Sequence, residues 1–317
     1  MNQISPAVWV ITVIVVFYIY AFEYVMAARN PHVVQPKEAA IGVSIYVAAA
    51  IAFGLGLWVL VGPEKGAEFF AGWITEYSLS VDNLFVFIVI MGSFAVPTLY
   101  QQKVLQIGIL GALVLRFAFI LVGAALLNAF WWMFFVFGGF LVYTAYKLAT
   151  THQGDTDPTR GKLVQSMQRF LPMTPTYHEG KYSMKIAGRR AFTPLLLVII
   201  AIFFTDLVFA LDSIPAIFGI TTDPYVVFTA NAFALMGLRQ LYFLVDGLLD
   251  KLIYLSYGLS LILALIGVKM IMHAAHEAGL CVPDVPTSLS LVVIVLILAA
   301  TMLLSLTFGR SRKQADG

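Results

Sequence analysis

The sequence predicts an all-α polytopic membrane protein with about nine transmembrane helices. Hydrophobic residues make up 61% of the 317 residues, charged residues make up 11%, and the mean hydropathy is +0.91. A composition this apolar lies outside the range of soluble globular domains. Two sets of three apolar segments also carry the same pattern of acidic residues. This repetition predicts that six of the helices form an inverted pair of three-helix repeats.

Each predicted helix is an apolar window of about 20 residues, the length that crosses a hydrocarbon core of about 30 Å. The windows run from Val8 to Met26, Ala39 to Val61, Phe69 to Phe94, Val104 to Leu127, Trp131 to Leu148, Pro194 to Gly219, Val226 to Leu244, Leu252 to Ile271 and Leu289 to Phe308.

The order of these windows divides the chain into five parts. Residues 1–62 hold two accessory helices, and residues 68–148 hold the first repeat. A basic loop at 149–193 precedes the second repeat at 194–272, and residues 273–317 hold an external loop, the ninth helix and a tail. Because each repeat has an odd number of helices, the second copy enters the membrane from the opposite side, as in many secondary transporters.

Lys and Arg residues predict which side of the membrane each loop faces. With the N-terminus outside, the basic residues of the 149–193 loop and of the C-terminal tail lie in the cytoplasm, and Lys65 is left outside. Cytoplasmic loops carry the excess of Lys and Arg in membrane proteins. We therefore expect a multi-pass protein of the cell membrane with its N-terminus outside and its C-terminus in the cytoplasm.

Acidic residues recur inside the first helix of each repeat. The first copy reads Thr75-Glu76-Tyr77-Ser78-Leu79-Ser80-Val81-Asp82-Asn83, and the second reads Thr205-Asp206-Leu207-Val208-Phe209-Ala210-Leu211-Asp212-Ser213. An acid costs about 3 kcal/mol at the middle of a membrane helix, so each of these residues indicates a function and a cationic partner.

The spacing of the acids does not place them on one helix face. At about 100° per residue, Glu76 and Asn83 share a face, whereas Asp82 lies about 120° away. Either the helix opens between its acids, or each acid faces a different neighbouring helix. Pro215 favours an opening in the second copy, because it leaves the carbonyl of Leu211 without its helical donor.

We call the two copies, residues 75–83 and 205–213, the signatures. Both supply oxygen atoms that could bind a metal ion. The predicted ligands are four carboxylates, an amide and a hydroxyl: Glu76, Asp82, Asn83, Asp206, Asp212 and Ser213. An all-oxygen set suits hard divalent cations such as Mn²⁺, Ca²⁺ or Mg²⁺. The sequence therefore predicts a midplane site for a transported divalent cation, and it predicts no tightly bound cofactor.

Two arginines allow another interpretation. Arg116 and Arg239 each follow a leucine in the second helix of a repeat, and they are candidates for counter-ions or gating residues. If Glu76 or Asp206 pairs with one of them, the polar residues form a buried structural network. Two arginines against four acids would still leave two formal negative charges to attract a divalent ion.

Several segments between about residues 66 and 272 occur in a specific order. They are Glu76-Tyr-Ser-Leu-Ser-Val-Asp82-Asn83, Tyr100-Gln101-Gln102-Lys103-Val104-Leu105, Phe170-Leu171-Pro172, Asp212-Ser213-Ile214-Pro215-Ala216-Ile217-Phe218 and Gly237-Leu238-Arg239. This series resembles the TerC family of integral membrane proteins, which is named for tellurium resistance. The resemblance implies efflux of divalent metal, chiefly manganese. Many members have Glu three residues before the acid at 206, where this chain has Phe203, so the number of ligands stays open.

We therefore expect a secondary transporter, and not an enzyme, that exports Mn²⁺ or a similar ion by alternating access. Because the sequence has no nucleotide-binding motif such as GxxxxGK[ST], proton exchange or the membrane potential would drive transport. Its expected partners are the metal ion, protons and the lipid bilayer, and nothing suggests nucleic acid. Two other classes stay open: a non-transporting membrane scaffold or stress sensor, and an intramembrane hydrolase with a catalytic acid pair.

Overall fold

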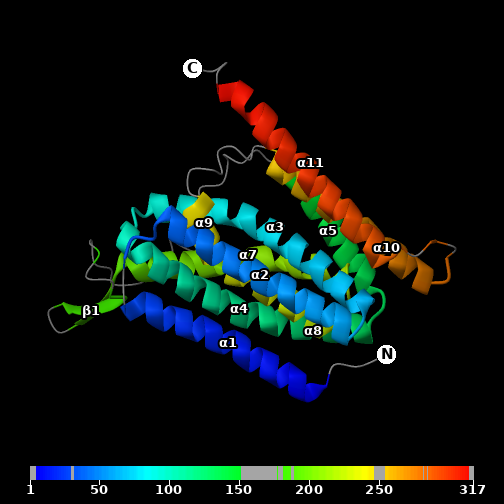
Figure 1. Cartoon of the computed structure of the whole chain (residues 1–317), viewed down its shortest axis with the longest axis horizontal. Coiled ribbons are helices and arrows are strands. Elements are labelled where there is room, and N and C mark those ends of the chain that lie inside the picture. The colour runs from blue at the N-terminus through cyan, green and yellow to red at the C-terminus, as the bar shows by residue number, and fades with distance from the viewer. Residues whose placement is uncertain are drawn as a thin grey trace.

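The computed structural model describes residues 5–29, 32–150, 177, 181–186, 189–245, 254–280, 282–283 and 285–313. Its helices, shown in Figure 1, are α1 (Pro6–Arg29), α2 (Pro36–Leu60), α3 (Pro63–Ser93), α4 (Thr98–Ala129), α5 (Met133–Thr150), α7 (Pro194–Phe218), α8 (Pro224–Met236), α9 (Leu238–Val245), α10 (Leu255–Glu277) and α11 (Thr287–Lys313). Two strands, β1 (Ser183–Ile186) and β2 (Arg189–Phe192), lie between α5 and α7.

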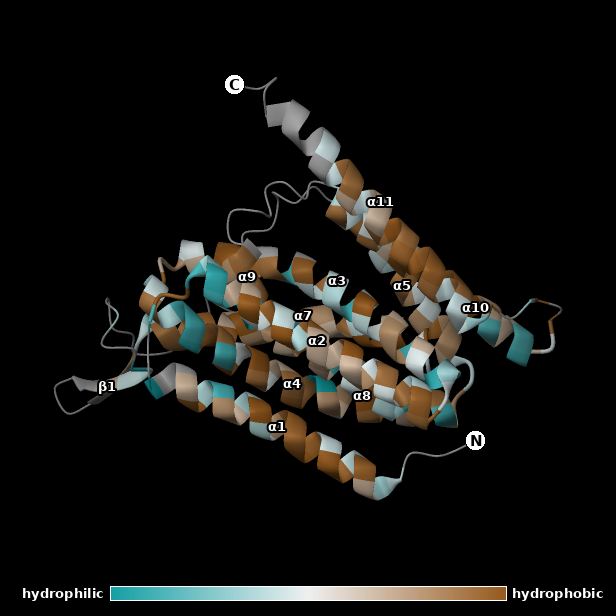
Figure 2. Ribbon diagram, viewed as in Figure 1, coloured by the Kyte–Doolittle hydropathy of each residue, from teal (hydrophilic) through white to brown (hydrophobic). Residues whose placement is uncertain are grey.

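Within the described ranges, nine helical spans are long and apolar enough to cross a membrane, with α8 and α9 sharing the span Pro224–Leu244. This confirms the predicted all-α fold class and its number of spans. Many large hydrophobic residues are exposed on the outside of the bundle, and Figure 2 colours much of α1 and α11 as hydrophobic. Tyr18, Leu60 and Val208 are examples of exposed apolar residues, and lipid tails would cover such a surface.

Several helices begin at a proline, which has no backbone N–H and therefore loses nothing in a first turn, where those groups have no helical partner. These residues are Pro6, Pro36, Pro63, Pro194 and Pro224. At α8 the preceding residue also acts as a cap, because the carboxylate of Asp223 accepts a hydrogen bond from the backbone N–H of Tyr225 at 3.0 Å.

Four helices form the centre of the bundle. Both α3 and α4 pack against α7 and α8, while α5 packs against α10. This set of contacts stays the same when α3 is exchanged with α7, α4 with α8 and α5 with α10. A two-fold relation between two three-helix units would produce such a pattern, and the inverted repeat itself stays a prediction.

The first two helices flank this centre. Helix α2 packs on α3, and α1 packs on α4. Helix α1 also contacts α8, because the Tyr20 hydroxyl donates to the carbonyl of Ala232 at 3.0 Å and the hydroxyls of Thr12 and Tyr225 share a hydrogen bond of 2.9 Å. The ring of Trp9 stacks on Phe228 of α8.

The prediction that a helix opens between its acids is wrong. Helices α3 and α7 are continuous through both signatures. Pro215 lies in the last turn of α7, which ends at Phe218, so its missing N–H frees a carbonyl close to the end of the helix without interrupting the middle. The acids of each signature therefore lie on one uninterrupted helix.

Three element boundaries also differ from the predicted windows. Helix α3 begins at Pro63, so Glu64 and Glu68 are helical and not part of a loop. The seventh window is divided at Gly237 into α8 and α9. The loop at 149–193 contains the antiparallel pair β1 and β2, in which Ser183 lies opposite Phe192. Most of this loop lies outside the described residues.

Helices α5 and α10 cross with their backbones in contact at two glycines. A Cβ atom added to Gly138 would lie 2.7 Å from the carbonyl oxygen of Gly267, and one added to Gly267 would lie 2.8 Å from that of Gly138. Small residues at membrane helix interfaces allow this close approach, and dispersion contacts along the crossing hold the helices together.

We expect Gly138→Val to destabilise the protein, because the new side chain would separate α5 from α10. Overpacking of this kind costs about 1 to 3 kcal/mol. The matched control is Gly139→Val, since a Cβ at Gly139 meets nothing within 4 Å. Thermal unfolding of the purified protein in detergent would measure the difference, and equal melting temperatures for both variants would contradict the crossing.

Candidate functional site

A buried arginine lies at the centre of the bundle. Arg116 of α4 is 1% exposed and reaches both signature helices. Its Nε and Nη2 donate to the two carboxylate oxygens of Asp206 on α7, at 2.9 and 3.1 Å. Its Nη1 donates to Glu76 Oε1 on α3 and, at 3.1 Å, to the hydroxyl of Ser213 on α7. Three helices thus meet at one guanidinium.

The geometry of this contact depends on the planar guanidinium. The Asp206 carboxylate receives two parallel N–H groups, which is the bidentate arrangement that arginine favours. Glu76 and Asp206 are almost completely buried, so neither carboxylate is stabilised by bulk water. Removing one partner from such a group leaves an uncompensated buried charge, which is far costlier than losing a surface ion pair.

Several polar atoms next to this contact are buried without a hydrogen-bond partner among the described residues. They include Oε2 of Glu76, the hydroxyl of Thr75 one residue before it, and the hydroxyl of Ser80 one turn later. Burying an oxygen without a partner costs free energy, so a cation or a hydrogen-bond donor that reached these atoms would be stabilised there. The Glu76 carboxylate therefore binds Arg116 through Oε1 and leaves Oε2 available for coordination.

Two of the remaining predicted ligands, Asp212 and Asn83, make no hydrogen bond to Arg116 among those that the structure describes. Asp212 precedes Ser213 in α7 and interacts electrostatically with both Glu76 and Arg116. Asn83 is buried in α3, about 10 Å along the helix axis from Glu76 at 1.5 Å per residue. The backbone of Asp82 is part of α3, and its side chain lies outside the described part of the structure.

In the described part of the chain, no three His, Cys, Asp or Glu side chains come close enough together to hold one metal ion. The guanidinium of Arg116 binds both Glu76 and Asp206. The predicted ligand set therefore stays a prediction. The chemistry of the carboxylates fits a hard cation, which would compete with Arg116 for the same oxygen atoms.

The second candidate counter-ion, Arg239, lies elsewhere. Its Nη2 is 3.6 Å from Glu23 Oε1, while Gln106 of α4 donates to Glu23 Oε2 at 3.0 Å. The side chain of Glu23 is 11% exposed, so this acid is largely buried beside Arg239. Glu23 and Arg239 line a cavity of about 380 Å³ with His32, Glu38 and Gln102, which we call the Glu23 cavity.

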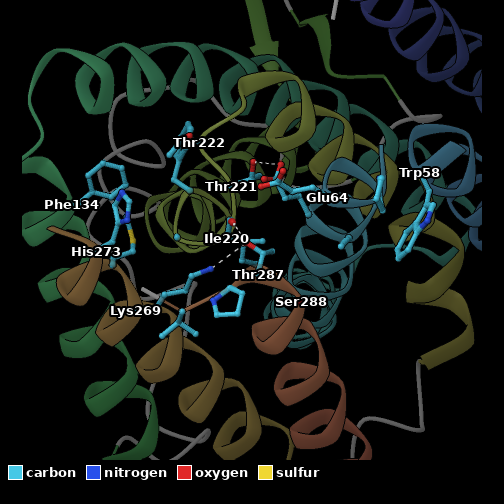
Figure 3. Close-up of a pocket in the computed structure, with 18 residues that line it drawn as sticks. Trp58, Glu64, Phe134, Ile220, Thr221, Thr222, Lys269, His273, Thr287 and Ser288 are labelled. Carbon is cyan, nitrogen blue, oxygen red and sulfur yellow. Dashed lines mark hydrogen bonds between the residues drawn. The ribbon is translucent and has the colours of Figure 1, made fainter. Parts of the chain in front are cut away.

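A larger cavity of about 630 Å³ lies where α3 begins. We call it the Glu68 cavity, and its polar lining includes Glu64, Glu68, Thr221, Lys269 and Thr287. Figure 3 shows polar groups of Thr221 and Thr287 near its middle, with Trp58 and Phe134 on opposite sides. It is formed by the starts of α3, α5 and α11 and by the ends of α7 and α10.

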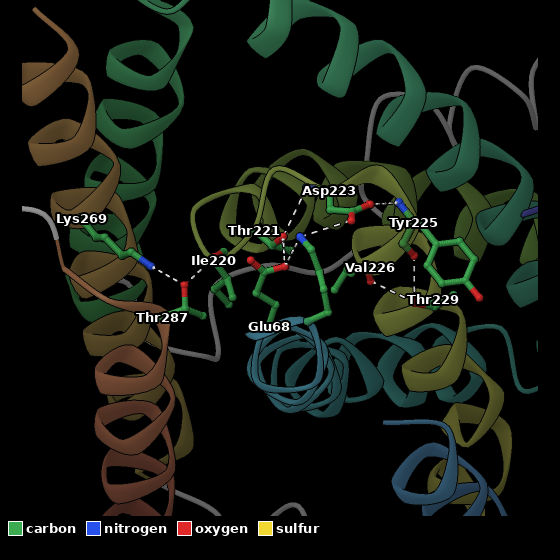
Figure 4. A network of polar contacts seen from close by, with 10 residues as sticks. Glu68, Ile220, Thr221, Asp223, Tyr225, Val226, Thr229, Lys269 and Thr287 are labelled. Atoms are coloured by element: carbon green, nitrogen blue, oxygen red, sulfur yellow. Dashed lines mark hydrogen bonds and ion pairs between the residues drawn. The ribbon is translucent and has the colours of Figure 1, made fainter. Parts of the chain in front are cut away.

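A network of polar contacts borders this cavity (Figure 4). Glu68 Oε2 accepts hydrogen bonds from Lys65 at 2.8 Å and from the Thr221 hydroxyl at 2.6 Å. Lys65 also lies 3.3 Å from Asp223. These contacts connect the first turns of α3 to the segment between α7 and α8. Glu68 is a buried acid that the sequence analysis did not single out.

The comparisons with known proteins agree with the sequence motifs. The profile described as the integral membrane protein TerC family matches residues 61–314. The chain belongs to the TerC family. The match covers α3 to α11 and therefore contains Glu76, Arg116 and Asp206.

Relatives of this TerC protein match almost its whole length. The chain is 40% identical to membrane protein STKORF319 of Myxococcus xanthus, covering 98% of this chain and 96% of that protein. It is 44% identical to membrane protein Rv2723 of Mycobacterium tuberculosis, covering 98% and 81%. It is 43% identical to the thylakoid membrane protein TERC of Arabidopsis thaliana, covering 84% and 67%. No solved structure matches this TerC protein.

We expect Arg116→Ala to lower the stability of the protein strongly, because Glu76 and Asp206 would stay buried without their cation. Breaking such a contact costs about 3 to 5 kcal/mol. Arg116→Lys should recover part of the loss, since lysine keeps the charge but not the bidentate geometry. Thermal unfolding and abundance in membranes would measure both variants.

Lys65→Ala is the comparison for this prediction, because Lys65 is more exposed than Arg116 and its pairs should contribute about 1 kcal/mol or less. A melting temperature of Arg116→Ala equal to that of Lys65→Ala would show that Arg116 does not hold the three helices together.

Proposed function

We propose that this protein exports Mn²⁺, or a similar hard divalent cation, from the cytoplasm by alternating access. The observation that carries the proposal is the Glu76 carboxylate, which binds Arg116 through one oxygen and has its second oxygen buried without a partner among the described residues. An acid in the centre of a membrane protein indicates a function by default, and a cation is a partner that would stabilise it there.

Charge balance supports a divalent ion. Glu76, Asp206 and Asp212 interact with one guanidinium, that of Arg116, so three ionised carboxylates would exceed the positive charge by two. A dication would neutralise this excess, whereas a monovalent ion would leave part of it in the low dielectric of the bundle. Oxygen ligands favour Mn²⁺, Ca²⁺ and Mg²⁺ over metals that prefer sulfur or imidazole.

The two cavities suggest the route of the ion. We take the N-terminus to be outside, as the Lys and Arg distribution favours, so the Glu68 cavity opens outward and the Glu23 cavity opens toward the cytoplasm. The Arg116 contact lies between them. Ion entry from the Glu23 side would displace Arg116 from the carboxylates, and its return would help to release the ion toward Glu68.

The first test is the metal content of cells. Deleting the gene should raise cytoplasmic Mn²⁺ in medium with added manganese, and overexpression should lower it. A scaffold, a stress sensor or an intramembrane hydrolase would leave the metal content unchanged. Unchanged Mn²⁺ in both strains would overturn the proposed export.

Asp212→Asn and Asp206→Asn should separate transport from stability. Asp212 interacts with Arg116 only electrostatically among the contacts described, so Asp212→Asn should abolish Mn²⁺ flux at normal abundance. Asp206→Asn removes an oxygen that Arg116 binds, and it should lower abundance as well as flux.

The duplicated signature predicts for Asp82→Asn the same result as for Asp212→Asn. Glu277→Gln, at an exposed helix end, is the control. Wild-type flux per molecule in Asp212→Asn would contradict the site.

Protons should compete with the metal ion. A dication binds carboxylates in their ionised form, so Mn²⁺ affinity should fall as the pH is lowered. If protons are exchanged for the ion, an acidic exterior should also accelerate efflux. Flux from proteoliposomes at fixed membrane potential would measure this, and flux that is indifferent to the pH gradient would exclude proton coupling.

A further inference from the structure

The side chain of Asn231 is the most unusual polar group of α8. It is 1% exposed, and neither Nδ2 nor Oδ1 has a hydrogen-bond partner among the residues that the structure describes. Its neighbour Thr229 shows the contrast, since that hydroxyl donates to the carbonyl of Tyr225 at 2.8 Å. A buried amide can accept at one end and donate at the other, and Asn231 has both ends available.

Contacts on either side of Asn231 show where its side chain points. Ala230 faces α3, because a Cβ on Gly72 would lie 3.3 Å from the Cβ of Ala230. Phe228 faces α4, through its contact with Phe117. At about 100° per residue, Asn231 lies between these two directions and on the side away from Phe233, which packs on Phe69. Its side chain therefore points into the space between α3, α4 and α7.

The same contacts give the depth of Asn231. Ala230 lies level with Gly72, and Gly237 lies level with Tyr77, so α3 and α8 run in parallel. Asn231 is one residue past Ala230, and Glu76 is four residues past Gly72. At 1.5 Å per residue, Asn231 lies about 5 Å nearer to the Glu68 cavity than Glu76 does. Helical side chains lean toward the N-terminus, so Glu76 extends toward the level of Asn231.

We propose that Asn231 is a further ligand of the transported divalent cation, with Oδ1 binding the ion on the Glu68 side of Glu76. Its Nδ2 can then donate to a neighbouring carboxylate, so ion binding would satisfy both ends of the amide and the second oxygen of Glu76. A neutral oxygen adds coordination without adding charge, which lets the ion leave the carboxylates toward the outside. This inference rests on the proposed function.

The test compares Mn²⁺ binding to purified, full-length variants in detergent by titration calorimetry. Asn231→Leu keeps the size of the side chain and removes both polar ends. It should weaken Mn²⁺ binding by about 10- to 100-fold, the usual effect of losing a polar contact to a charged group, without lowering the melting temperature. Asn231→Asp keeps an oxygen at the same position and should bind Mn²⁺ at least as tightly as the wild type.

Thr229→Val is the matched control, because it removes a buried hydroxyl that is already bonded within α8, and it should bind Mn²⁺ like the wild type. If Asn231→Leu does not accumulate in membranes, Asn231→Ala replaces it. Wild-type affinity in the apolar variant would overturn the inference, as would a parallel loss of affinity and melting temperature in the apolar and Asp variants. Absence of Mn²⁺ binding by the wild type would instead overturn the proposed function, and this inference with it.

Discussion

The structure depends on the guanidinium of Arg116, which donates to Asp206, Glu76 and Ser213 at the centre of the bundle. A planar group with fixed donor directions allows few positions for its partners. Helices α3, α4 and α7 must therefore keep one relative depth and rotation for as long as the contact exists. Any motion that slides the signature helices past each other must first release Arg116, so the proposed ion exchange and the helix arrangement are coupled.

The two ends of the bundle use comparable chemistry. At one end, Lys65 and Thr221 hold Glu68. At the other, Arg239 and Gln106 hold Glu23. Each contact joins separate helices or the segments between them and is partly shielded from water, where ion pairs are stronger than at an exposed surface. Under the proposed alternating access, the central site lies between these two ends, which would rearrange at different times.

The structure contains the membrane spans that hydropathy predicted from the sequence. The length of each apolar window determines whether it can cross a membrane, so the spans were predictable from composition. The pairing of the arginines was not. Arg116 and Arg239 follow the same local pattern, but a position along a helix does not reveal which neighbour it faces. The break at Gly237 begins a new helix just before Arg239, and α1 supplies Glu23 beside it.

Other differences have equally local causes. Pro215 suggested an opening, but it lies in the last turn of α7, where its missing N–H does not interrupt the middle of the helix. Asn231 was visible as an amide in an apolar window, but its lack of partners among the described residues depends on the packing of α3, α4 and α7 around α8. The side chain of Asp82 lies outside the described part of the structure, so the prediction that Asp82 is a ligand still rests on the duplicated signature.

Helix α1 lies before the segment that matches the TerC profile, yet it contributes Tyr20 to the α8 backbone and Glu23 to Arg239. A chain that began at the profile boundary would lack Glu23, the acid that Arg239 and Gln106 share. The boundary of the profile is therefore not the boundary of the folding unit.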